Sequence, residues 1–286
     1  NTTGNHNNSL GYLALYYNTT GSQNTAIGGT ALYSNTTASD NTAVGYTALY
    51  ANTTGVRNTA VGKDSLKANT TGGENTAVGN HSLEANTTGL HNSAFGYSSL
   101  ASNTTGQRNT AVGQNAMLSS TTGNYNVAMG FNALDANTTG SQNTSIGDSS
   151  MSTNTTGVKN IAVGQAALAN NTTGEHNVSN TAIGRGVMEQ NTTGYNNTAS
   201  GHIALISNTT GYDNIAFGAY SLQANTTGFD NTSVGKSALY ANTTASYNTA
   251  IGRNALGETT TGARNTALGR LAGSTNTTGQ YNTFLG

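Results

Sequence analysis

Histidine is the side chain in this sequence that is best suited to binding a metal ion. The chain has five: His6, His81, His91, His176 and His202. They fall on different copies of a 17-residue repeat, at repeat positions 6, 13, 6, 6 and 12, so no two are expected to share an ion. Calcium-binding solenoid repeats carry Asp in each repeat, whereas this chain has only 11 acidic residues in all. We therefore predict exposed turn histidines, no metal site and no cofactor.

The residue patterns of catalytic sites are absent from the sequence. It contains no recognisable Ser/His/Asp arrangement, no phosphate-binding glycine motif and no carboxylate pair. A glycine count of 37 is not in itself such a motif. The sequence therefore predicts a protein that is not an enzyme.

The tripeptide Asn-Thr-Thr, which is an acceptor sequence for N-glycosylation, occurs fifteen times. Asn18, Asn35 and Asn52 are accordingly possible glycosylation sites. Glycans on successive repeats about 4.8 Å apart would crowd one another, and an Asn held in an internal ladder cannot be modified. Ser120 and Thr259 replace this Asn in two copies, which favours a hydrogen-bonding role that a hydroxyl can also fill.

Aromatic residues recur at fixed positions in successive repeats. Such rings either bind the face of a sugar or simply stabilise neighbouring coils, and we favour the second interpretation. Adjacent threonines such as Thr2 and Thr3 point to different faces of an extended chain, which argues against an ice-binding array. The possible surface binding ladder consists of Tyr195, Tyr212 and Phe229, and a second row of rings consists of Tyr16, Tyr33 and Tyr50.

Composition excludes several classes of protein. Only 7% of the 286 residues are charged, the formal net charge is −1, and Pro, Cys and Trp are absent. Without a basic stripe to neutralise phosphates, a nucleic-acid partner is not expected. No run of about 18 apolar residues is present, so we predict no membrane insertion of this segment. Because the chain begins and stops in phase with its repeat, we expect a fragment of a longer protein.

The elements that position these side chains follow from the repeat itself. Counting from the Asn of Asn-Thr-Thr, the chain is a single array over residues 1–286 of seventeen copies, the last one partial. Every step is 17 residues except that from Asn171 to Asn191, which is 20 and places a three-residue insertion near residues 177–179. Position 7 is Asn and position 11 is Gly in every copy. This regularity predicts a solenoid.

Variation among the copies predicts the shape of one coil. Position 10 is mostly Val, Ile or Phe and position 8 is sometimes Val or Ile, so both are expected to face inward, with the small position 9 packed closely on the other face. Strands are expected at positions 7–10 and 14–17, with glycines at positions 4 and 11 turning the chain at positive φ. A helical turn after position 11, as in leucine-rich repeats, is the alternative.

Residues at one repeat position should form continuous rows along the solenoid. Positions 5, 6, 12, 13 and 16 vary in charge and size and are expected to face solvent. The predicted structural Asn ladder includes Asn24, Asn41, Asn58 and Asn75, and the predicted turn glycines include Gly28, Gly45, Gly62 and Gly79.

The thin core predicts self-association. About two large inward side chains per coil contribute some 1.5 to 3 kcal/mol each, while ordering seventeen residues costs on the order of 20 kcal/mol or more. A coil this poor in apolar residues is expected to bury its small-residue face against other copies. We therefore predict a homo-oligomer.

Thr25, Ala26, Ile27, Gly28 and Ala31 carry a resemblance to a known family. The motif is similar to the head repeats of trimeric autotransporter adhesins, and the NTTG-linked copies resemble tail-fibre-like proteins of phages and bacterial surface proteins. The resemblance implies an all-β parallel β-solenoid (a β-roll), left-handed and trimeric, with a cell-surface glycan or matrix receptor. Because the period here is longer than in those heads, no ligand-binding residues are carried over.

These features together predict a structural repeat protein. We expect the shaft or head of an extracellular, cell-surface or virion fibre used for surface attachment. The alternative is a glycosylated extracellular matrix filament without a dedicated receptor.

Overall fold

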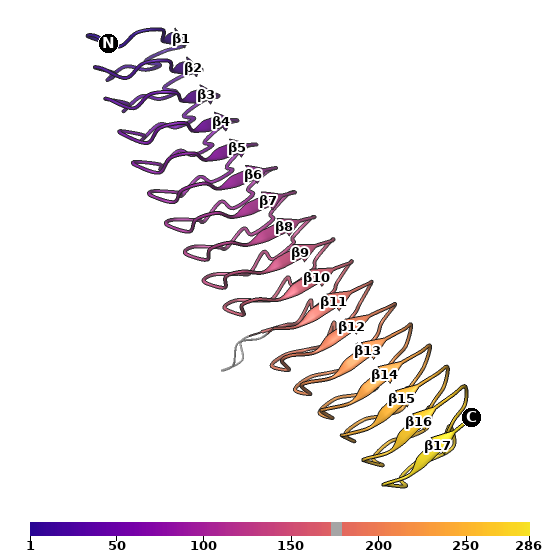
Figure 1. Cartoon of the computed structure of the whole chain (residues 1–286). Helices are drawn as coiled ribbons and strands as arrows, with labels where there is room; N and C mark the ends of the chain where they lie inside the picture. The colour runs from indigo at the N-terminus through magenta and orange to yellow at the C-terminus, as the bar shows by residue number, and fades with distance from the viewer. Residues whose placement is uncertain (173–178) are drawn as a thin grey trace. The chain divides into compact units, whose positions relative to one another are not determined.

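The computed structural model describes residues 1–172 and 179–286, and in these residues every strand is three residues long and no helix is present (Figure 1). The chain comprises two units, Asn1–Gln142 and Asn143–Gly286. The strands of the first unit are β1 (Asn8–Leu10), β2 (Thr25–Ile27), β3 (Thr42–Val44), β4 (Thr59–Val61), β5 (Thr76–Val78), β6 (Ser93–Phe95), β7 (Thr110–Val112) and β8 (Val127–Met129). Those of the second are β9 (Thr144–Ile146), β10 (Ile161–Val163), β11 (Thr181–Ile183), β12 (Thr198–Ser200), β13 (Ile215–Phe217), β14 (Thr232–Val234), β15 (Thr249–Ile251), β16 (Thr266–Leu268) and β17 (Thr283–Leu285).

Within each unit, successive strands pair in parallel and in register. Thr42 of β3 lies opposite Thr59 of β4, and the same repeat positions face each other from β1 to β8. The second unit continues the pattern from β9 to β17. Each unit is therefore a parallel β-solenoid, as predicted, and the helical alternative is wrong.

The expected second strand at positions 14–17 is absent from the described coils. Thr47 and Leu49, at positions 13 and 15, have φ of 55° and 52°, and the same positions are left-handed in most other copies. A left-handed residue cannot continue a pleated strand, and a non-Gly residue adopts this conformation at a cost of about 1 kcal/mol. The amide of Thr47 bonds to Gly29 O in the preceding coil (3.0 Å), and that of Leu49 to Ser65 O in the following coil (3.0 Å). These bonds to both neighbouring coils hold the segment in place.

The strand faces the opposite way from the prediction. Ala43 at position 9, Ala48 at position 14 and Leu49 at position 15 are fully buried, and the same positions form the core along both units. Position 10 faces outward, where Phe95 is 41% and Ile183 is 45% exposed. The strand has this orientation because the interior of the coil is narrow. The space between the strand and the left-handed segment holds Ala opposite Leu and has no room for a second large side chain. The small residues consequently pack against this chain's own leucines, so the expectation that they face other copies is wrong.

Glycine is invariant at position 11 of the repeat and predominates at position 4, and the two positions differ in backbone conformation. Gly45 at position 11 has a φ of 141°, and a Cβ on it would lie 2.4 Å from Gly62 O in the next coil. Gly55 at position 4 does not have positive φ, contrary to the prediction, but a Cβ there would lie 2.2 Å from Gly72 O. The predicted turn glycines Gly28, Gly45, Gly62 and Gly79 all have φ between 126° and 141°.

The predicted three-residue insertion falls largely outside the described residues. Asn177 and Val178 are not described, and Ser179 is exposed. β10 and β11, which flank the insertion, pair with Ile161 opposite Thr181. The longer connection therefore leaves the strand register intact.

Candidate functional site

The asparagines of Asn-Thr-Thr form a buried ladder that uses their side-chain nitrogens. Asn35 Nδ2 donates to Asn18 Oδ1 in the preceding coil (2.7 Å) and to Ala38 O in its own coil (3.0 Å). Asn18 and Asn52 make the equivalent pairs of bonds and are likewise buried. N-glycosylation requires this nitrogen, so in the folded chain all three proposed acceptor residues are inaccessible.

The invariant asparagines at position 7 form the second ladder, which includes Asn24, Asn41, Asn58 and Asn75. Asn41 N donates to Asn24 Oδ1 (3.0 Å), and Asn41 Nδ2 donates to Gly55 O (2.9 Å). The ladder is thus mainly side chain to backbone, where stacked side-chain amides were expected. Each Asn therefore hydrogen-bonds at the start of its strand both to the Asn of the preceding coil and to the carbonyl at position 4 of the following repeat. These two bonds explain why no other residue replaces it.

The predicted surface binding ladder is a closely packed row of rings. Tyr195 and Tyr212 stack with their ring centroids 4.9 Å apart and an interplanar angle of 5°. Tyr212 and Phe229 stack with centroids 4.7 Å apart and an interplanar angle of 8°. Tyr247 and Phe229 pack edge to face, with ring centroids 5.2 Å apart and an interplanar angle of 77°. Burial is the main cause that raises the pKa of Tyr212. Because the ring faces within the row cover one another, this ladder stabilises its coils and has no space between rings for a sugar.

The other aromatic row ends beside an open groove in the first unit. Tyr33 stacks on Tyr16 (5.7 Å, 9°) and on Tyr50 (5.1 Å, 0°), and Tyr17 packs edge-on against Tyr33 at 5.0 Å. A hydrogen bond with Tyr17, together with burial, raises the pKa of Tyr33 to about 12. The groove beyond Tyr50 has a volume of about 670 Å³. Its lining includes Tyr50, Lys67 and Glu84, with small residues at Ala51, Ala68, Ala85, Ala101 and Ser102.

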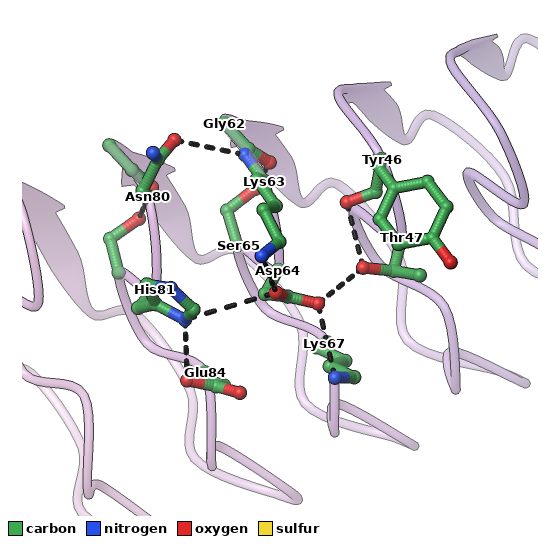
Figure 2. Close-up of polar contacts among 12 residues, drawn as sticks. Tyr46, Thr47, Gly62, Lys63, Asp64, Ser65, Lys67, Asn80, His81 and Glu84 are labelled. Carbon is green, nitrogen blue, oxygen red and sulfur yellow. Dashed lines mark hydrogen bonds and ion pairs between the residues drawn. The ribbon is translucent and has the colours of Figure 1, made fainter.

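A cluster of charged side chains adjoins this groove, and we call its members Asp64, His81 and Glu84 the acid–histidine cluster (Figure 2). Asp64 and His81 occupy position 13 of successive repeats, and Glu84 follows three residues after His81. Both Asp64 (φ 56°) and His81 (φ 59°) have left-handed backbone, and the in-register stacking of adjacent coils places them in the same row. His81 Nδ1 lies 2.9 Å from Glu84 Oε2 and 3.9 Å from Asp64 Oδ2.

The Asp64 carboxylate is buried but has charged and polar partners. Thr47 in the preceding coil donates a hydrogen bond to Oδ1, and Lys67 Nζ lies 3.1 Å from the same oxygen. Lys63 Nζ lies 3.7 Å from Oδ2. Burial alone would raise the pKa of the Asp64 carboxyl, but Thr47 and the two lysines outweigh it, so that pKa lies below its ordinary value. The hydrogen bond with Asp64 in turn raises the pKa of Lys67.

The remaining histidines lie in less elaborate surroundings. His91 Nδ1 lies 3.0 Å from Glu74 Oε2, and Arg57 lies 2.8 Å from the other oxygen of that carboxylate. The ring of His202 packs edge-on against Tyr220 at 5.6 Å. His6 lies in the first coil at left-handed φ, and His176 lies outside the described residues.

Sequence reasoning missed the acid–histidine cluster for two reasons. No two histidines occupy the same position of adjacent repeats, and position 13 was expected to face solvent, whereas Thr47, Asp64 and Ser98 at that position are buried. A signal was available in the sequence. Asp64 and His81 stand at the same position of adjacent repeats, where most other copies have Thr, Ser or Asn.

The chain was compared with family models, curated proteins and solved structures, and none of them matches. In the described residues, no helix has the length and apolar character needed to cross a membrane.

Proposed function

We propose that this chain is part of the shaft or head of an extracellular, cell-surface or virion fibre that mediates attachment, and that three copies wind together as a left-handed β-roll. The observation that carries the proposal is the pair of buried Asn ladders, which join coil to coil within each unit. Together with backbone bonds to both neighbouring coils, they favour stiff units, each with a length set by its number of repeats.

The outward strand face supports self-association. No copy has a charged residue at position 8 or 10, whereas positions 6, 12 and 16 contain most of the charges near the strand. Apolar side chains such as Ile27, Phe95 and Phe217 are at least 40% exposed on this face. A strand about 10 Å long at a spacing of about 4.8 Å covers roughly 50 Å². The strand face of the first unit, β1 to β8, therefore offers roughly 400 Å², and that of the second, β9 to β17, offers roughly 450 Å². A second and a third copy of the chain are the occupants that fit this uniform, uncharged face.

Substitutions on the strand face test the arrangement. We expect Val44→Lys combined with Val61→Lys to convert a three-chain species to monomers in sedimentation equilibrium, because a trimer would bury the introduced charges. Asn80→Lys, at the exposed position 12, is the matched control and should leave the mass unchanged. A strand-face variant with the same mass as the control would exclude this face as the interface.

Attachment is tested separately from assembly. The freely varying residues at positions 5, 6, 12 and 16 would provide the contacts, with a cell-surface glycan or a matrix protein as receptor. We expect the intact chain to bind saturably to at least one surface in a panel of immobilised glycans and matrix proteins. If the chain binds none of these surfaces saturably, the attachment role is wrong and the chain is a structural filament only.

A further inference from the structure

The geometry points to a binding site for a divalent transition metal of the zinc class, formed by Asp64, His81 and Glu84. Each residue offers one ligand atom, and the three atoms lie within 4.8 Å of one another. In the part of the chain that the structure describes, this is the one group in which three potential ligands converge. The inference is independent of fibre assembly.

The distances between the ligand atoms suit a single ion. Zinc bonds of about 2.0–2.1 Å in tetrahedral geometry place neighbouring ligand atoms about 3.3 Å apart. His81 Nδ1 lies 2.9 Å from Glu84 Oε2 and 3.9 Å from Asp64 Oδ2, so the two observed separations bracket that value. Movements of about half an ångström would bring both His81 separations to that value, while the Asp64 and Glu84 ligand atoms, which lie within 4.8 Å of each other, would have to approach by up to about 1.5 Å. The side chains of His81 and Glu84, which are 29% and 37% exposed, have the freedom to make them.

The ligand types determine the class of metal. An imidazole nitrogen favours zinc, copper, nickel or cobalt over calcium and magnesium, which prefer shells made of oxygen alone. Two carboxylates would balance the charge of a divalent ion. Three protein ligands would leave one coordination position for water or a ligand in solution, and Glu84 also lines the open groove beyond Tyr50.

The buried Asp64 is held so that one oxygen remains for an ion. Thr47 and Lys67 both engage Oδ1, while Oδ2 is directed toward His81 (Figure 2). Hydrogen bonds of this kind orient a ligating carboxylate in metal sites. Lys63 would compete with the ion for Asp64 Oδ2, because its Nζ lies 3.7 Å from that oxygen. Its side chain is 56% exposed and moves readily into solvent when an ion binds.

Glu74 and His91 provide a matched comparison within the same unit. Their contact of 3.0 Å resembles that of Glu84 with His81, but Arg57 occupies the other oxygen of Glu74 and no second carboxylate converges there among the described residues. Two ligands beside an arginine should bind a divalent ion much more weakly than three.

The test uses the tag-free full chain after treatment with a chelator. Zn²⁺ is titrated by calorimetry, and Co²⁺ by the absorption bands that report tetrahedral coordination with a nitrogen ligand. We expect one ion per chain, with affinity at least tenfold weaker in His81→Ala and in Glu84→Gln and unchanged in His91→Ala. Lys63→Ala, which removes a cation without removing a packed side chain, should bind more tightly than the unmodified chain.

Two results would overturn the assignment. Absence of binding to the unmodified chain and to Lys63→Ala would mean that the cluster is an ion-pair network alone. Equal weakening by His81→Ala and His91→Ala would mean that ions bind surface histidines without a defined site. Circular dichroism of every variant establishes that the coils remain folded, and Lys63→Ala still decides the outcome if a ligand variant does not fold.

Discussion

Removing one Asn from the position-7 ladder should weaken the solenoid locally and by a predictable amount. Asn58 is fully buried, and its Nδ2 donates to Gly72 O at 2.8 Å. Its Oδ1 accepts from Asn75 N at 3.0 Å and Asn75 Nδ2 at 3.2 Å. In Asn58→Ala, Gly72 O loses one of its donors and the amide of Asn75 loses its acceptor inside the core.

The free energy of this change follows from the bonds that are lost. A net hydrogen bond contributes about 1 kcal/mol, and a buried donor left without an acceptor costs about 1–3 kcal/mol. The sum is about 3 kcal/mol, equivalent to roughly a hundredfold change in an equilibrium constant. Because a repeat protein opens in parts, the change should be confined to coils near residue 58.

Native-state hydrogen exchange measures this local opening. We expect amides in β3, β4 and β5 of Asn58→Ala to exchange about a hundredfold faster than in the unmodified chain. Asn80→Ala is the control, because exposed Asn80 accepts a single bond from Lys63 N at 3.2 Å. Exchange in Asn58→Ala that is no faster than in Asn80→Ala would refute the claim that the ladder stabilises the coils.

Three further perturbations test other parts of the fold. Gly45→Ala should lower the melting temperature strongly, because its Cβ would lie 2.4 Å from Gly62 O at a φ of 141°, whereas Gly29→Ala, facing the Tyr46 ring at 3.2 Å, should change it little in the same melts. Leu66→Ala removes a fully buried side chain and should cost about 2–5 kcal/mol in denaturant unfolding; a cost below about 1 kcal/mol would show that the core collapses around the gap. The pKa of Asp64 lies below its ordinary 3.8 in the folded chain, so its stabilisation is complete above the unfolded pKa and is lost as pH falls through the folded one. The melting temperature of Asp64→Asn should therefore fall less steeply below about pH 4 than that of the unmodified chain. An equally steep fall in the two proteins would contradict this.

The sequence predicted the features that depend on a single repeat position. The invariant Asn at position 7 and Gly at position 11 indicated a buried polar row and a close turn, and the structure places Asn41 and Gly45 in those roles. The constant period predicted in-register parallel stacking. These inferences needed no knowledge of how wide a coil is.

The features that depend on the cross-section of the coil were not predictable in the same way. Small Ala43 and large Val44 alternate, and either face of the strand could in principle be the core. Which face is buried depends on the space beside Leu49, and that space depends on left-handed backbone at Thr47 and Leu49. Neither Thr nor Leu indicates such a conformation, since both residue types normally avoid it.

The candidate metal site was missed because its members are distant in sequence and close only across coils. Asp64 and His81 are seventeen residues apart, and they come together because adjacent coils stack in register. Once the register is known, reading each repeat position as a row along the solenoid brings these two residues together at once.

The mass of the purified chain in solution is the most direct test of the central claim. We predict three copies associated through the uncharged strand face, so sedimentation equilibrium should give about 87 kDa, three times the chain mass of 29.0 kDa. A concentration-independent mass of 29.0 kDa would contradict it, because a stable monomer would leave the apolar strand face in water.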